Sequence, residues 1–130
     1  MRRVPTVPLR EGWLTYLPGS VDRTRPGLYE WHIEGVGSYI GKYTRISRPE
    51  REYTKNLLKM LNGWPYRPKH PTKFRHIHQQ LKLAYDSGAR ITLRLLENVE
   101  PTDLSRREAE LIAERGALND PPFGRRKTSN

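Results

Sequence analysis

The clearest pattern in the sequence is an alternation of apolar and polar residues in two short stretches, residues 27–34 and 90–97. Alternation with this period is typical of a β-strand with one buried face. The glycines within residues 35–37 favour a hairpin turn after the first stretch. Residues 38–43 are therefore predicted to return as an antiparallel strand, because so short a link cannot join parallel strands.

Three other stretches repeat their apolar residues with the period of an α-helix, residues 49–61, 73–87 and 103–115. With the helical rotation of about 100° per residue, the apolar side chains of each stretch fall on one face. Each stretch is also followed by a glycine, which suits the end of a helix. By contrast, residues 1–25 are interrupted by prolines and are predicted to form an irregular arm with one anchored segment. Residues 121–130 are expected to form a basic, flexible tail.

The predicted elements follow the order strand, strand, helix, helix, strand, helix over residues 26–120. This order predicts an α+β fold, in which a three-stranded antiparallel sheet is flanked by three helices. A chain of 130 residues is long enough for one compact domain of this kind, and no internal repeat points to a second one.

The charge of the chain adds a class of partner to this fold. Lys and Arg number 24 against 14 Asp and Glu, for a net charge of +10. So strong an excess favours a polyanionic partner, most often nucleic acid. The chain has no cysteine, which excludes disulfides and cysteine-bound zinc. No stretch reaches membrane-spanning length, so we expect a cytoplasmic protein with no membrane partner.

One carboxylate on the third predicted helix is distinguished by its position. Glu108 falls on the apolar face that Leu104 and Leu111 also share. The neighbouring Glu110 and Glu114 instead fall toward solvent. A buried carboxylate is costly unless it is paired or binds a metal ion. Helix geometry therefore leaves two interpretations open for Glu108, a structural ion pair with an arginine and a functional group.

Two tyrosines lie in the strands of the predicted hairpin. Tyr29 and Tyr39 are ten residues apart around its turn, and as cross-strand neighbours they would present both phenols to one site. Tyrosine is also a favoured strand residue, so a purely structural role in the core is the alternative.

Basic residues gather just after the second predicted strand and along the helix that follows it. Arginine forks suit phosphate oxygens, so the cations nearest to the strand predict an anion-binding pocket, and an ordinary solvated basic face is the alternative. We also expect the basic residues at position 45 and within residues 55–59 to contact nucleic acid. The cations of the pocket are Lys42, Arg45, Arg48 and Arg51, and those expected on nucleic acid are Arg45, Lys55 and Lys59.

Two short motifs and a later helix resemble the GIY-YIG nuclease superfamily. The sequence GLY at residues 27–29, followed by YIGK at residues 39–42, is similar to the paired signature of that family, with leucine in place of the usual isoleucine. The sequence REAELI at residues 107–112, with Asn119 after it, is similar to the family's third helix and closing asparagine. The resemblance extends over about residues 26–120, and the family has the same order of strands and helices.

The resemblance implies a divalent-metal-dependent endonuclease that hydrolyses DNA. It implies one Mg²⁺ or Mn²⁺ per active site, held by Glu108, and a scissile phosphate contacted by tyrosines and an arginine. Tyr29 is then the residue that orients or deprotonates the attacking water. Tyr39 is implied to bind the water or the phosphate. Lys42 is implied to be a further catalytic residue, next to the two tyrosines.

Two further positions are implied to support the site, Gly41 and Asn119, the latter through hydrogen bonds near the second hairpin strand. The catalytic arginine is harder to place, because the family's position near the start of the helix is Pro49 here. Arg51 is our first choice for this arginine and Arg48 is the second.

A further residue, one turn into the same helix, departs from the family's pattern. Lys55 stands where the family often has a histidine or a tyrosine. The main alternative function is a catalytically inactive, nuclease-like module that binds nucleic acid, and a structural protein is a further one. The sequence leaves the DNA target open, and with it the choice between a lone domain, a homodimer and a subunit guided by a protein partner.

Overall fold

The computed structural model describes residues 6–44, 48–70 and 74–119. Within these ranges the chain forms four strands, three α-helices and two short 3₁₀ turns. The strands are β1 (Thr15–Leu17), β2 (Gly27–Ile33), β3 (Gly37–Tyr43) and β4 (Ile91–Asn98). The helices are α1 (Arg48–Asn62), α2 (His76–Ser87) and α3 (Leu104–Arg115), and the 3₁₀ turns are η1 (Pro101–Asp103) and η2 (Ala117–Asn119).

The prediction of a three-stranded antiparallel sheet is wrong, because the sheet has four strands and is mixed. Its order is β1-β4-β2-β3, and β1 runs parallel to β4 whereas the other neighbours are antiparallel. β1 lies in the segment predicted to be an irregular arm. It has only three residues, too few to show a period, and it is a strand because its backbone pairs with residues 92–94 of β4. Pairing of this kind depends on a distant partner, so the local pattern does not predict it.

The hairpin and the three helices agree with the prediction within a few residues. The hairpin turn comprises residues 34–36, one residue earlier than predicted. Tyr29 consequently pairs with Gly41, and Tyr39 pairs with Trp31. The two tyrosines are therefore diagonal neighbours with ring centroids 6.5 Å apart, rather than directly opposite each other.

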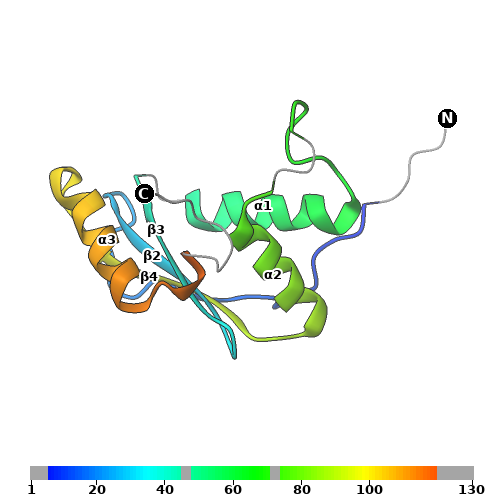
Figure 1. Cartoon of the computed structure of the whole chain (residues 1–130), viewed down its shortest axis with the longest axis horizontal. Coiled ribbons are helices and arrows are strands. Elements are labelled where there is room, and N and C mark those ends of the chain that lie inside the picture. The colour runs from blue at the N-terminus through cyan, green and yellow to red at the C-terminus, as the bar shows by residue number, and fades with distance from the viewer. Residues whose placement is uncertain (1–5, 45–47, 71–73, 120–130) are drawn as a thin grey trace, which may run out of the picture.

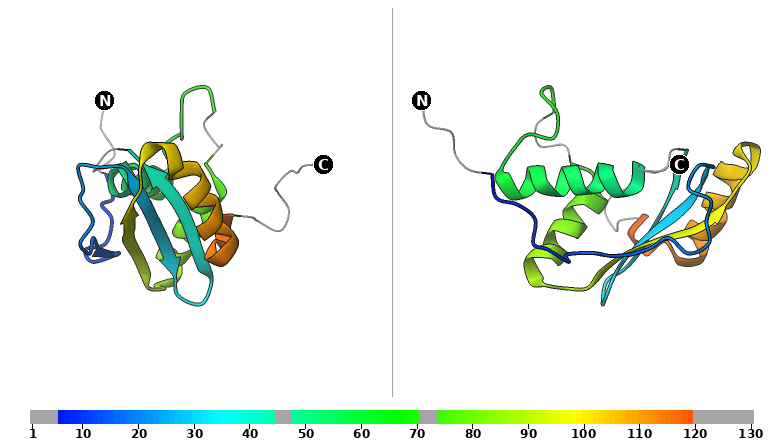
Figure 2. Two further views of the ribbon diagram at one scale, coloured as in Figure 1. Left: turned by 90° about the vertical axis from the view of Figure 1, so that its left-hand side faces the viewer. Right: turned by 180° about the vertical axis from the view of Figure 1, so that it is seen from behind.

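The sheet is covered on both faces (Figure 1). α1 and α2 lie on one face, and α3 lies on the other, alongside the edge strand β3 (Figure 2). The odd-numbered residues of β2 and β3 form the larger core with α1 and α2. The even-numbered Leu28 and Ile40 meet Leu104 and Leu111 of α3 in a second, smaller core. No helix in the described part of the chain is long and apolar enough to cross a membrane.

One buried carboxylate and two partly exposed arginines fix α3 to the sheet. The Glu30 side chain is only 2% exposed and accepts hydrogen bonds from Arg115 at 3.0 and 3.1 Å and from Arg94 at 3.2 Å. Arg94 is the cross-strand partner of Glu30 on β4, and Arg115 is the last residue of α3. A buried carboxylate needs such partners to offset its desolvation. The group therefore fixes the C-terminal end of α3, and with it the helix face that carries Glu108.

Candidate active site

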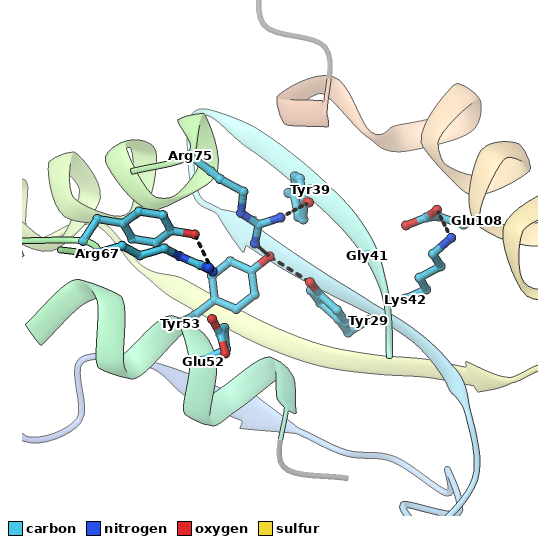
Figure 3. Close-up of a pocket in the computed structure, with 10 residues that line it drawn as sticks. Tyr29, Tyr39, Gly41, Lys42, Glu52, Tyr53, Arg67, Arg75 and Glu108 are labelled. Carbon is cyan, nitrogen blue, oxygen red and sulfur yellow. Dashed lines mark hydrogen bonds and ion pairs between the residues drawn. The ribbon is translucent and has the colours of Figure 1, made fainter. Parts of the chain in front are cut away.

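A cavity of about 370 Å³ lies at the edge strand β3, and Figure 3 shows the side chains around it. Its lining comes from both faces of the sheet. The two faces meet at Gly41, where β3 has no side chain. Five residues singled out in the sequence line this one cavity: Tyr29, Tyr39, Gly41, Lys42 and Glu108.

Gly41 makes room for the ring of Tyr29. The two residues pair across β2 and β3, and a Cβ atom at position 41 would lie 2.3 Å from Cζ of Tyr29 and 2.4 Å from its hydroxyl oxygen. Non-bonded carbons normally stay about 3.5 Å or more apart. The ring can therefore lie across β3 only where the backbone carries no side chain, and this packing directs the Tyr29 hydroxyl toward the cavity.

A chain of hydrogen bonds links three tyrosines to one arginine (Figure 3). The hydroxyls of Tyr29 and Tyr53 are 2.8 Å apart. Arg75 donates to the Tyr53 hydroxyl at 2.7 Å and, at the longer distance of 3.5 Å, to the Tyr39 hydroxyl. Tyr53 belongs to α1 and Arg75 immediately precedes α2. The planar guanidinium is thereby held with its charge at the cavity, an arrangement that suits a phosphate.

The two tyrosines in the middle of this chain resist ionisation. Burial, and then the neighbouring Tyr39, raises the pKa of Tyr29 well above its ordinary value. Burial, and then Tyr29, raises the pKa of Tyr53 in the same way. A tyrosine with a raised pKa is almost never a phenolate near neutral pH, so it cannot serve as a base there. The geometry suits the orienting role expected for Tyr29, and the deprotonating role gains no support.

On the other face of the sheet, Glu108 projects from α3 toward Lys42. Its side chain is 21% exposed, and its Oε1 lies 3.8 Å from Lys42 Nζ. Lys42 donates a shorter hydrogen bond, 2.9 Å, to Ser105 Oγ. Burial raises the pKa of Glu108, and Lys42 lowers it only in part. Glu108 is thus a poorly compensated oxygen donor at the cavity wall, and its nearest charged partner is a lysine rather than an arginine.

Asn119 is bonded to the outer edge of β3. Its carboxamide oxygen accepts a hydrogen bond from the backbone N–H of Ile40 at 2.7 Å, and its amide nitrogen donates to the carbonyl of Ile40 at 2.8 Å. This contact is on the second hairpin strand, where the family resemblance places the asparagine. The two bonds hold β3 directly beside Tyr39 and Gly41.

The arginine favoured from the sequence lies away from the cavity. Arg51 is exposed and lies with Lys55 beside a separate hollow on α1. The side chain of Arg48 and the whole of Arg45 lie outside the described residues. Lys59 donates to a backbone carbonyl of the segment that follows α1, at 2.8 Å, so it holds that segment in place.

Five other residues complete the lining, and the sequence analysis did not single them out. The helical period places His78 on the buried face of α2. Arg75 stands three residues earlier, so the same period brings it to the edge of that face. The period also places Tyr53 on the apolar face of α1, which indicates a core residue, but its hydroxyl reaches past the core. The five are Glu52, Tyr53, Tyr66, Arg67 and Arg75.

His78 positions the start of α2 and therefore Arg75. Nδ1 of His78 accepts a hydrogen bond from the backbone N–H of Arg75 at 3.2 Å. The side chain is buried, and burial, followed by the charge of Arg75, lowers the pKa of His78 to about 4. His78 is therefore neutral near neutral pH and able to accept this bond.

The donor chemistry around Glu108 fits one hard divalent cation with few protein ligands. Mg²⁺ prefers oxygen ligands and keeps several waters, so one carboxylate and the phosphate of a substrate are enough to bind it. In the described part of the chain, no three acidic or histidine side chains gather into a fuller metal site. Glu108 could supply one carboxylate ligand to such an ion.

Comparison of the chain with protein-family models, with curated proteins and with solved structures gives no match. The chemistry of the cavity is therefore the basis for assigning a function.

Proposed function

We propose that this chain is a divalent-metal-dependent endonuclease of the GIY-YIG type, which hydrolyses phosphodiester bonds of DNA. The observation that carries the proposal is that residues of two sequence motifs and of a distant helix line one cavity. Tyr29, Tyr39 and Lys42 come from the hairpin, and Glu108 comes from α3. Hydroxyls, cations and a carboxylate in one cavity suit the hydrolysis of an anionic phosphodiester. The net charge of +10 favours the same class of substrate.

The cations at the cavity bind the scissile phosphate. Arg75 is held by the hydroxyls of Tyr53 and Tyr39, so its fork is preorganised for two phosphate oxygens. Lys42 adds a second positive charge from the other face of the sheet. Both stabilise the negative charge that grows on the phosphate oxygens in the transition state. The hydroxyls of Tyr29 and Tyr39 orient the phosphate and the attacking water through hydrogen bonds.

Glu108 holds one Mg²⁺ or Mn²⁺ in this proposal. When bound, such an ion neutralises charge on the phosphate and stabilises the departing 3′ oxygen. The protein supplies a single carboxylate to the ion, so the affinity for the metal in the absence of DNA is weak.

Nicking of supercoiled plasmid DNA tests the proposal. The wild type is expected to convert the plasmid to open circles with Mg²⁺ or Mn²⁺, and to stop when EDTA removes the metal. Glu108→Gln keeps the size of the side chain but removes the anionic ligand, and should reduce nicking to background. Glu114→Gln removes an exposed carboxylate from the same helix. It is the matched control and should nick like the wild type.

Three other outcomes would contradict the proposal or part of it. A wild type that binds DNA but does not nick it with either metal indicates a nuclease-like binding module. Equal nicking by Glu108→Gln and the wild type removes the metal role of Glu108. A Glu108→Gln variant that loses its circular dichroism and thermal transition indicates a structural role for this carboxylate.

A further inference from the structure

A second carboxylate lines the cavity, on the wall opposite Glu108. Glu52 belongs to α1 and directly precedes Tyr53. It lines the same cavity as Glu108, but it comes from the face of the sheet that α1 covers, whereas α3 lies on the other face. Figure 3 shows the two carboxylates on opposite sides of the tyrosines, with Glu52 beside the ring of Tyr53.

The carboxylate of Glu52 stands apart from the ion pairs that hold the described part of the fold together. Among the side chains that the structure describes, none makes a hydrogen bond or ion pair with it, and the contact recorded for Glu52 uses its backbone carbonyl. Glu30 and Glu97, by contrast, are each bonded to arginine. A negative charge also opposes the binding of an anionic phosphate. Among the described residues, the charge of Glu52 thus supports neither an ion pair nor the binding of an anion, and its place at the cavity points to a chemical role.

The reaction needs a group that takes a proton from water. Arginine and lysine side chains donate hydrogen bonds and do not accept them, and burial keeps Tyr29 and Tyr53 protonated. Glu108 is assigned to the metal ion. Glu52 is the one other carboxylate among the described residues that line the cavity.

The positions of the two carboxylates match an in-line displacement. In such a reaction the water attacks phosphorus on the side opposite to the departing oxygen. A phosphate held by Arg75 and Lys42 lies between the two walls of the cavity. With the departing 3′ oxygen on the side of Glu108, the water approaches from the wall that carries Glu52.

We propose that Glu52 is the general base of the cleavage reaction, an inference that rests on the nuclease function proposed above. A carboxylate oxygen of Glu52 accepts one proton from the water as the water oxygen forms its bond to phosphorus. The bond between phosphorus and the 3′ oxygen breaks, and its electron pair stays on the 3′ oxygen, which takes a proton from solvent. The products are a 5′ phosphate and a 3′ hydroxyl, and Glu52 returns its proton to solvent.

Single-turnover cleavage of plasmid DNA by Glu52→Gln tests this role. Glutamine keeps the size of the side chain but does not accept the proton, so the rate is expected to fall by about 100-fold or more. DNA binding without metal should stay the same or tighten, because a negative charge leaves the cavity. Glu50→Gln is the matched control. Glu50 lies on the same helix beside a different hollow, and its variant should cleave like the wild type.

Chemical rescue separates proton transfer from other roles of the side chain. Glu52→Ala opens space beside Tyr53, so added formate should restore part of the cleavage rate in proportion to its concentration. Formate should not help Glu52→Gln, because the glutamine side chain fills the same space.

Several results overturn the role of Glu52. Cleavage by Glu52→Gln at the wild-type rate would overturn it. Failure of formate to rescue Glu52→Ala would overturn it as well. If a higher Mg²⁺ concentration restores the cleavage rate of Glu52→Gln, the general-base role is also excluded, because Glu52 would then be a metal ligand. A wild type that cuts with neither metal removes the nuclease function and this role together. Cleavage by the wild type and Glu52→Gln, but not by Glu108→Gln, removes the role of Glu52 alone.

Discussion

Gly41→Ala is expected to impair both the stability of the domain and its cleavage of DNA. The new Cβ atom would lie 2.3 Å from Cζ of Tyr29, which is about 1.2 Å closer than carbons normally approach. The ring has little room to retreat. It packs against Tyr39, Tyr43 and Tyr53 with centroid distances of 6.5, 6.4 and 5.9 Å, and its hydroxyl is bonded to that of Tyr53.

The size of the effect follows from these contacts. Overpacking of a filled core typically costs about 1–3 kcal/mol, and loss of the hydroxyl–hydroxyl hydrogen bond adds about 1 kcal/mol. We therefore expect the free energy of unfolding to fall by about 2–4 kcal/mol and Tm by roughly 10 °C or more. Nicking should fall as well, because a displaced Tyr29 no longer directs its hydroxyl into the cavity.

Urea unfolding of four proteins measures this effect: the wild type, Gly41→Ala, Tyr29→Leu and the double variant. Leucine keeps apolar volume at position 29 but lacks the Cζ and hydroxyl atoms that the new methyl group would meet. The Gly41→Ala substitution should therefore cost much less in the Tyr29→Leu background. Equal costs in the two backgrounds, or wild-type stability of Gly41→Ala alone, would refute the packing account of this glycine.

Three further predictions concern charged and titratable groups. Arg75→Ala should lower single-turnover nicking by about 100-fold or more, whereas Arg51→Ala should mainly change the salt dependence of DNA binding; the opposite ranking in the plasmid assay would restore Arg51 as the catalytic arginine. His78 has its pKa lowered from 6.5 to about 4, so the unfolded chain binds a proton first and stability falls as pH falls through this range, by up to about 3 kcal/mol. Urea unfolding across the same range should show a much weaker dependence in His78→Gln, and an equal dependence would exclude His78 as its source. Glu30→Ala should lower the free energy of unfolding, measured by urea, by about 1–3 kcal/mol, because its charged hydrogen bonds are lost while the two partly exposed arginines can be hydrated; a loss below about 0.5 kcal/mol would show that the ion group is dispensable.

Helix α1 shows how far periodicity predicts the site. Its apolar stripe is evident in the sequence and places Tyr53 on the side of the core. Arg51 lies two residues earlier and so points about 160° away from Tyr53, which means that the two side chains cannot face one cavity. Nearness to the YIGK motif in sequence favoured Arg51. Among the described side chains, the arginine bonded to Tyr53 and Tyr39 is instead Arg75, from the start of the next helix. The face of α3 that carries Glu108 could be predicted from the period of that helix alone, whereas helix geometry left the role of Glu108 open.

Contacts between distant segments explain what the pattern does not predict. Alternation in β2 places Glu30 on a polar face, and a polar face is normally the solvated one. α3 covers that face, so the carboxylate is buried and bonded to Arg94 and Arg115. The pairing of β1 with β4 is of the same kind, because three residues become a strand only where a distant backbone is available.

The bonds between Asn119 and Ile40 also bear on association between molecules. An open strand edge invites the addition of a strand from another chain. One carboxamide satisfies both backbone groups of Ile40, as a neighbouring strand would, but it offers no further edge on which a sheet can grow. The backbone of Ile40, next to Gly41, is thereby unavailable to a strand from another chain. A strand added to β3 at this point would have to break both of these hydrogen bonds.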